Sequence, residues 1–250
     1  MQRLIEIVNY LATSDRQYGV TEVSRELKIP KATVYRILSA LVDAHWVDKN
    51  PESRRYGLSD VFLQMGLSQL SRHNLRRVSL PFLNNLQSLT HESAALSVRI
   101  GLERMFIETV ESESEIRIIV PLGLRIALWS GAIGKVMLAY MQDEEKEQVI
   151  SKLTQDGVKV YPTGLALRIS ELADELRDIE KQGYAVGSGE RVPDAYAAAA
   201  PIFNKGGRVT GAISIHGPAP RFTLDSAISN APPVCDAARK ISLQMGAIFE

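Results

Sequence analysis

The clearest periodic pattern of apolar and polar positions in the chain lies in residues 29–46. Apolar residues recur there at the i, i+3, i+4, i+7 and i+8 spacing that lines one face of an α-helix. They are Val34, Ile37, Leu38, Leu41 and Val42. Pro30 suits the start of this helix, because the N–H that proline lacks has no intrahelical partner in the first turn.

The opposite face of the same helix is polar and basic near its start. Lys31 and Arg36 bring positive charge and N–H donors, and Thr33 and Tyr35 add hydroxyl groups. These side-chain types contact the phosphates and base edges of DNA.

A shorter helix is expected directly before it, over residues 21–28. Thr21 is placed at its N-cap, and Val23 and Leu27 at buried positions. Two helices joined by a tight turn, the second with a basic leading edge, form the helix-turn-helix pattern, whose second helix enters the major groove. A plain helical hairpin inside a core is the alternative, and this stretch alone leaves the two open.

The segment after the second helix favours DNA binding. Residues 46–48 and 54–58 predict two short strands, and the sequence Asn-Pro-Glu-Ser at 50–53 is typical of a turn. Arg54 and Arg55 lie near the tip of this hairpin, from which they can reach phosphate or the minor groove, as the wing of a winged helix does. The residues predicted to contact DNA are Thr21, Lys31, Ala32, Thr33, Tyr35, Arg36, Arg54 and Arg55.

The remaining chain predicts helices interleaved with strands. An amphipathic helix over 3–12 completes the first domain, and 59–74 predict a linking helix that Ser59 and Asp60 can cap. Further helices are expected at 75–90, with Pro81 in or near the first turns, and at 131–140, 144–153, 169–182 and 231–248. Strands are expected at 94–100, 104–110, 116–120 and 209–216, and Gly101 is expected to form the turn between the first two. This order indicates an α/β or α+β layer fold with a mixed or antiparallel sheet.

Composition limits the classes of function. The 250 residues are 45% hydrophobic and 23% charged with a net charge of zero, so affinity for nucleic acid has to come from a local basic patch. The single cysteine, Cys235, excludes an internal disulfide framework and suits a reducing cytoplasm. No long apolar run predicts a membrane span, and the N-terminus lacks the pattern of a signal peptide. We therefore expect a cytoplasmic protein.

Catalytic chemistry has no candidate in the sequence. The four histidines, at positions 45, 73, 91 and 216, show no metal-ligand spacing, and no Gly-x-Ser-x-Gly motif is present. The glycines at 131 and 134 do not form a phosphate-binding loop, because Val136 stands where that motif needs Ser or Thr. No enzymatic activity, metal or cofactor is expected.

Three stretches, in order, resemble the IclR-type family of bacterial transcriptional regulators. The first is the pair PKATVYRIL at 30–38 and RRYGL at 54–58. The second runs through residues 123–139, and the third comprises 183–202 and 211–218. Together they cover essentially the whole chain, so the chain is identified as similar to this family throughout.

The resemblance implies both an architecture and a function. It implies a winged helix-turn-helix over 1–58, a linker helix over 59–74 and a GAF-like α/β domain over 75–250 that binds a small effector. It also implies a homodimer through the N-terminal domain, or a dimer of dimers, on a roughly palindromic operator, with repression as the expected mode of control. The rival hypothesis is a small-molecule sensor whose winged helix mediates protein contacts only.

The effector pocket implied by the resemblance involves the start of the helix at 131. Small residues there leave backbone N–H groups exposed, which favours a bound carboxylate; tight packing of helix on sheet is the alternative reason for the glycines. The candidate pocket residues are Ile118, Trp129, Gly131, Ala132, Ile133, Gly187, Ala197, Ser214 and His216.

Four of these positions depart from the family pattern. Trp129 stands where the family usually has His, Gly187 where it has Asp, Ala197 where it has Cys, and His216 where a small residue is common. Lost polar groups and added flat surfaces predict a carboxylate larger and more apolar than glyoxylate or pyruvate, an aromatic acid above all. The alternative is that Trp129 fills the pocket itself.

Overall fold

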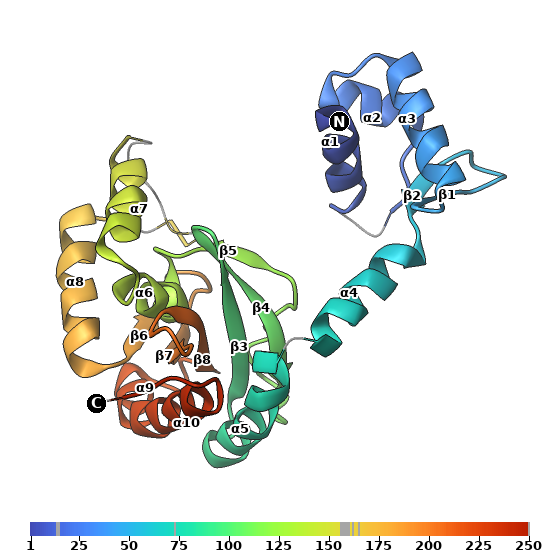
Figure 1. Ribbon diagram of the computed structural model, residues 1–250. Helices are drawn as coiled ribbons and strands as arrows, with labels where there is room; N and C mark the ends of the chain where they lie inside the picture. Colours follow the sequence, from blue (N-terminus) through green and yellow to red (C-terminus); the bar gives the residue numbers. More distant parts are fainter. Residues whose placement is uncertain (14–15, 73, 156–160, 162, 165, 250) are drawn as a thin grey trace. The chain divides into compact units, whose positions relative to one another are not determined.

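The computed structural model describes residues 1–13, 16–72, 74–155, 161, 163–164 and 166–249 (Figure 1). The chain divides into two compact units, Met1–His73 and Asn74–Glu250. Each unit is built around its own elements and is described by itself.

The first unit is a helix-turn-helix followed by a two-stranded hairpin. Its elements are α1 (Gln2–Leu11), α2 (Val20–Leu27), α3 (Lys31–Asp43), β1 (Val47–Lys49), β2 (Tyr56–Leu58) and α4 (Asp60–Arg72). The apolar face predicted for α3 is buried, with Val34 and Leu38 fully enclosed and Leu41 nearly so. Tyr18 joins this core and bridges to Tyr56, which ties the loop before α2 to the hairpin.

Two predicted helix caps in this unit are wrong. Helix α2 begins one residue early at Val20, with Gly19 at its N-cap, so Thr21 lies exposed inside the first turn. The Ser59 hydroxyl donates to the His45 carbonyl (2.6 Å) instead of capping α4. Near the start of α4, Phe62 packs edge-on against Trp46, with ring centroids 5.2 Å apart, which explains why this helix groups with the first unit.

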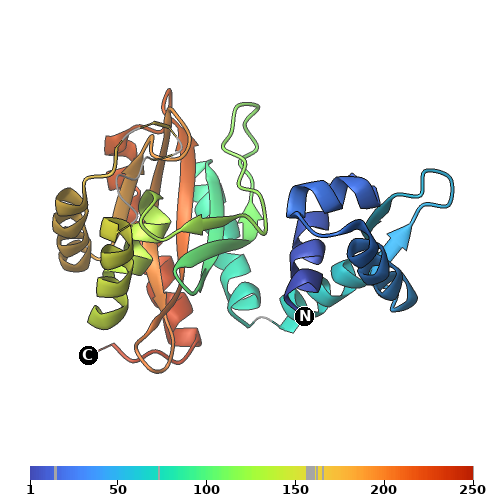
Figure 2. The same cartoon turned by 90° about the horizontal axis from the view of Figure 1, so that it is seen from above.

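The second unit is a six-stranded sheet with helices on both faces (Figures 1 and 2). Every strand pairing in it is antiparallel, and the order is β5-β4-β3-β8-β7-β6. Its strands are β3 (Ser93–Ile100), β4 (Glu103–Val110), β5 (Arg125–Ala127), β6 (Ala185–Ser188), β7 (Ala195–Phe203) and β8 (Val209–Pro218). The predicted α+β class is therefore confirmed, in its antiparallel form.

Helices cover the two faces of this sheet with different partners. The helices are α5 (Asn74–Thr90), α6 (Gly131–Ala139), α7 (Asp143–Gln155), α8 (Ile169–Gln182), α9 (Leu224–Ser229) and α10 (Ala231–Gln244). Helices α5 and α10 pack together on one face, whereas α6 packs on β6, β7 and β8 from the other, with α8 outside it. The core between sheet and α6 contains Phe106, Ile133 and Met137.

The structure corrects several predicted elements of this unit. Residues 116–120 form an irregular loop and not a strand, because their backbone pairs with no strand of the sheet. Ile116 is 73% exposed and Ile119 61%, whereas Val120 is buried. The edge position is taken by β5, which pairs with β4. Pro81 lies in the middle of α5 and not in its first turns. The predicted C-terminal helix corresponds to α10, which ends at Gln244, and a separate short helix, α9, precedes it.

In the described part of the chain, no helix combines the length and the apolar character that crossing a membrane requires.

Gly134 explains part of the small-residue pattern at α6. A Cβ added there would lie 2.4 Å from the carbonyl oxygen of Leu128, so the helix packs against this backbone at a distance that only glycine allows.

We expect Gly134→Ala to destabilise the protein by about 1–3 kcal/mol through overpacking, measured by urea denaturation. Gly66→Ala in α4 is the matched control, since a Cβ there meets open space. It should be neutral or stabilise by up to about 1 kcal/mol, and an equal loss in both variants would contradict the packing argument.

Candidate functional site

The exposed face of α3 presents the side chains that the sequence predicted to contact DNA. Lys31, Ala32 and Arg36 are exposed, Thr33 is half-buried, and Tyr35 keeps 54% of its surface accessible. Because Val34 and Leu38 fix the opposite face in the core, the orientation of this polar face is set by packing.

The two wing arginines have different surroundings. The loop from Asn50 is held by its side-chain oxygen, which accepts from the backbone N–H groups of Glu52 and Ser53. Arg55 donates to the Gln17 carbonyl (2.7 Å) and lies 3.7 Å from Glu22, so it attaches the wing to the loop before α2. Arg54 is exposed and forms no ion pair with any described residue.

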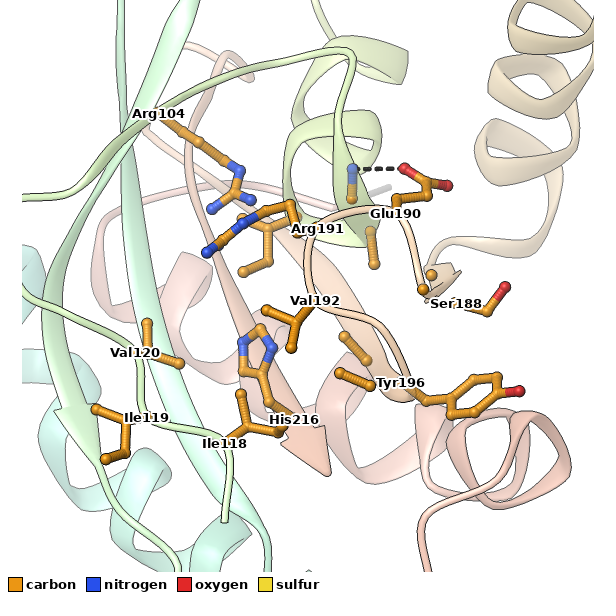
Figure 3. Close-up of a pocket in the computed structure, with 17 residues that line it drawn as sticks. Arg104, Ile118, Ile119, Val120, Ser188, Glu190, Arg191, Val192, Tyr196 and His216 are labelled. Atoms are coloured by element: carbon orange, nitrogen blue, oxygen red, sulfur yellow. Dashed lines mark hydrogen bonds between the residues drawn. The ribbon is translucent and has the colours of Figure 1, made fainter. Parts of the chain in front are cut away.

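A cavity of about 70 Å³ lies in the second unit, between the sheet and the start of α6 (Figure 3). It is lined by Arg104, Ile118, Ile119, Val120, Gly131, Ala132, Ile133, Gly187, Ser188, Gly189, Glu190, Arg191, Val192, Ala195, Tyr196, Ala197 and His216. All the predicted pocket residues are among them except Trp129 and Ser214. The sheet register explains part of this grouping, since Gly187 pairs with Ala197 and Ala197 with His216, so the three residues face the same side.

Trp129 does not face this cavity. Its ring packs against Tyr161 with centroids 5.5 Å apart, at the edge of the core between α6 and the sheet. It therefore neither offers a stacking surface to a ligand in the cavity nor fills it, and the stacking argument for an aromatic ligand loses its main residue.

The anion position at the start of α6 is already filled by the protein itself. The Gly131 N–H donates to Glu190 Oε2 (2.8 Å), as the dashed line in Figure 3 shows. Glu190 also accepts from the ammonium of Lys135, which is 3% exposed and donates to Glu175 as well (2.7 Å). Burial alone would lower the pKa of Lys135, but Glu190 and Glu175 outweigh it and raise this pKa. The Gly131 N–H is therefore already paired within the protein, and a ligand carboxylate at this helix end stays a prediction that requires displacement of Glu190 or use of another N–H group.

Gly187 does not enlarge the cavity, although it stands where the family has the larger Asp. A Cβ at this residue would lie 2.9 Å from the backbone nitrogen of Ala132. The missing side chain is taken up by the close approach of α6 to β6, so an Asp here would require a shift of the helix.

His216 is a neutral, oriented side chain in the cavity wall. The Ser214 hydroxyl can donate to the Ala95 carbonyl (3.2 Å) and shares a 2.8 Å hydrogen bond with His216 Nε2, in which the tautomer of the imidazole sets which atom donates. Burial, with the nearby charges of Arg104 and Arg191, lowers the pKa of His216 to about 3. Ser214 thus acts behind the cavity wall by orienting the imidazole.

The cavity residues that the sequence analysis missed include two arginines, Arg104 and Arg191. Arg104 is 1% exposed, and burial together with Arg191 lowers its pKa to about 9. Burial likewise lowers the pKa of Arg191. One signal was available for Arg104: it stands two residues before Phe106 on a predicted strand, which places a charge in phase with a core residue. Nothing in the sequence marked Arg191.

Clusters of three or more histidine, cysteine or acidic side chains that could hold a metal are absent from the described residues.

Comparison with known proteins gives matches over nearly the whole chain. Residues 1–51 match the model of the IclR helix-turn-helix domain, and residues 67–243 that of the bacterial transcriptional regulator IclR C-terminal domain. The HTH-type transcriptional repressor AllR of Escherichia coli K12 is 29% identical over 246 residues, which cover 98% of this chain and 90% of AllR.

Solved structures share the fold. The IclR structure from Thermotoga maritima has a TM-score of 0.74 at 25% identity and covers 98% of both chains. An IclR homolog from Microbacterium hydrocarbonoxydans, complexed with 4-hydroxybenzoate, has a TM-score of 0.78 at 20% identity and also covers 98% of both chains.

The lowered pKa of His216 predicts a pH dependence of stability. Between its ordinary pKa near 6.5 and its folded value of about 3, only the unfolded chain takes up the proton. The contribution of His216 to the free energy of unfolding is therefore complete above pH 6.5, and it falls by at most about 1.4 kcal/mol per pH unit as the pH drops below that value. Urea denaturation at pH 7.5, 6.5 and 5.5 should show a smaller loss for His216→Asn than for the wild type. His45→Asn, an exposed control, should keep the wild-type slope, and an unchanged slope in both variants would contradict the prediction.

Proposed function

The chain belongs to the IclR family of bacterial transcriptional regulators, and from that premise we propose that it is a ligand-responsive repressor of genes of organic-acid metabolism. DNA binding and control of transcription follow from the family. Repression is supported by AllR, whose name describes it as a transcriptional repressor. The ligand, the contacts with the operator and the assembly are parts of the proposal.

The observation that carries the DNA side is the fixed polar face of α3. In our proposal this helix enters the major groove, with Tyr35 and Arg36 directed at base edges and Lys31 at phosphate. Thr21, Ala32 and Thr33 lie close enough in sequence to complete the contact surface, and the wing adds Arg54. A salt-dependent, sequence-selective gel shift separates this function from a winged helix that contacts proteins only.

A homodimer, or a dimer of dimers, is part of the same proposal. Helix α4 exposes Leu63 (62%) and Leu67 (56%) one turn apart on the same face, an apolar surface that a second copy of the chain could cover. Two recognition helices then match operator half-sites about one helical turn apart.

The cavity beside α6 is the proposed effector site. It is a partly open, largely apolar hollow with a few convergent polar groups, which is the usual form of a metabolite site. The Microbacterium homolog holds an aromatic acid, 4-hydroxybenzoate, on the same fold. Since Trp129 lies outside the cavity, we propose an organic acid and do not require an aromatic ring.

Arg36→Ala tests the recognition helix. Arg36 is exposed beside the buried Leu38 face, so its loss should leave the fold intact and weaken operator binding by about 1–3 kcal/mol if it contacts a base. Fluorescence anisotropy with operator and scrambled DNA measures this loss. Unchanged operator affinity would remove Arg36 from the interface.

Arg54→Ala and Arg55→Ala should differ, because only Arg55 is held by the protein. Arg54→Ala should weaken binding to all sequences alike and lower the magnitude of the salt slope by about one unit, with an unchanged melting temperature. Arg55→Ala should also lower the melting temperature, since it releases the wing from Gln17 and Glu22. Identical melting temperatures for the two variants would argue against the anchoring role of Arg55.

A further inference from the structure

Two guanidinium groups meet at one end of the cavity without a carboxylate beside them. Figure 3 shows Arg104 and Arg191 side by side above His216. Both lie against the Phe106 ring, with their central carbons 4.8 Å and 5.9 Å from its centroid. The only hydrogen bond of the Arg104 side chain to a described residue is a long one, from Nη2 to the Ser130 carbonyl at 3.5 Å, and its Nε and Nη1 have no partner there.

The carboxylate of Glu190, which lines the same cavity, is paired with other groups of the protein. Glu190 accepts from the Gly131 N–H and from Lys135, and neither arginine forms an ion pair with any described residue. An imidazole is either neutral or cationic, so His216 cannot balance the charge in either state. The cavity therefore has a cationic end that the described protein groups leave uncompensated.

Such an arrangement is costly unless an anion completes it. A buried charge without a partner loses its hydration, and two neighbouring cations also repel each other. Arginine donors arranged together match the geometry of a carboxylate, which can accept several N–H bonds at once. A partly open, cationic pocket whose arginine donors lack partners among the described residues is thus suited to an anionic group from outside the protein.

The other end of the cavity has a different character. Ile118, Val192 and Ala197 provide apolar walls. In Figure 3, Ile118 lies on the side of His216 away from the arginines, and Val192 lies beside the imidazole. A volume of about 70 Å³ has room for roughly five water molecules, which corresponds to a small organic acid.

We propose that Arg104 and Arg191 together bind the carboxylate of the effector, whose short apolar body extends toward Ile118 and Val192. This deepens the proposed function and rests on the cavity being the effector site. It places the anion at β4 and the loop after β6, and not at the start of α6, where Glu190 already sits.

The test uses the full-length protein and four acids, butyrate, pyruvate, benzoate and 4-hydroxybenzoate, each paired with its uncharged amide at equal ionic strength. At least one acid should raise the melting temperature by about 5 °C or more at saturation, and its amide should not. Titration calorimetry on that acid should show affinity at least about tenfold weaker in Arg104→Met and in Arg191→Gln, since each loses charged donors. Arg208→Gln, an exposed arginine outside the cavity, is the control and should bind as the wild type does.

Folding and binding are separable in these variants. Arg104→Met should melt at or above the wild-type temperature without ligand, because it removes a buried unpaired charge. If it does not fold, the half-buried Arg191 carries the test alone. Binding of an acid with equal affinity to wild type and folded variants, equal binding of acid and amide, or no response to any of the acids would overturn the proposal.

A gel shift with operator DNA on the same samples keeps the two proposals apart. An acid that binds through the arginines but leaves DNA affinity unchanged supports the carboxylate site and contradicts the regulatory function. Release of DNA by an acid that binds equally well to both arginine variants supports the regulatory function and contradicts the arginine site.

Discussion

The charge pattern of the second unit depends on the position of one carboxylate, that of Glu190. It neutralises the positive end of α6 at Gly131 and the buried ammonium of Lys135 at the same time. With Glu175 as the second partner of Lys135, this network is complete within the protein. Because Glu190 is held there, it does not pair with Arg104 or Arg191, and positive charge accumulates at the other wall of the cavity. This internal network pairs the start of α6 within the protein and leaves Arg104 and Arg191 as the cationic side chains that line the cavity.

The sheet supplies the geometry in which these charges act. Gly187, Ala197 and His216 are register partners on three neighbouring strands, so one row carries two small residues and one large one. The missing side chain at Gly187 allows α6 to lie directly on β6, which brings the helix start, Glu190 and Lys135 into one cluster. His216 then borders the cavity, oriented by Ser214 from behind. Close backbone packing and the cavity are therefore two results of the same alternation of small and large residues.

The first unit follows a simpler rule, in which burial of one helix face fixes the direction of the other. Val34 and Leu38 fix α3 by packing, while Arg55 fixes the wing by a hydrogen bond to Gln17 and a charge contact with Glu22. The surface left exposed is small and locally basic, which is consistent with a chain whose net charge is zero. Affinity for DNA in such a protein depends on placing a few side chains correctly and not on a general positive field.

Motifs and local patterns in the sequence were enough to identify the family, the helix-turn-helix and three of the six strands of the sheet, β3, β4 and β8, because periodic burial and turn residues act over a few neighbouring positions. It placed α3 and its buried face correctly, and it found the hairpin of β3 and β4 through Gly101. It could not tell a strand from an apolar loop at 116–120, since both alternate in the same way and only pairing distinguishes them. Partners distant in sequence were decided by the tertiary structure alone: Glu190 with Gly131, Trp129 with Tyr161, and Arg104 with Arg191. Charge balance in a cavity is a property of groups brought together from separate strands and loops, and no local pattern records it.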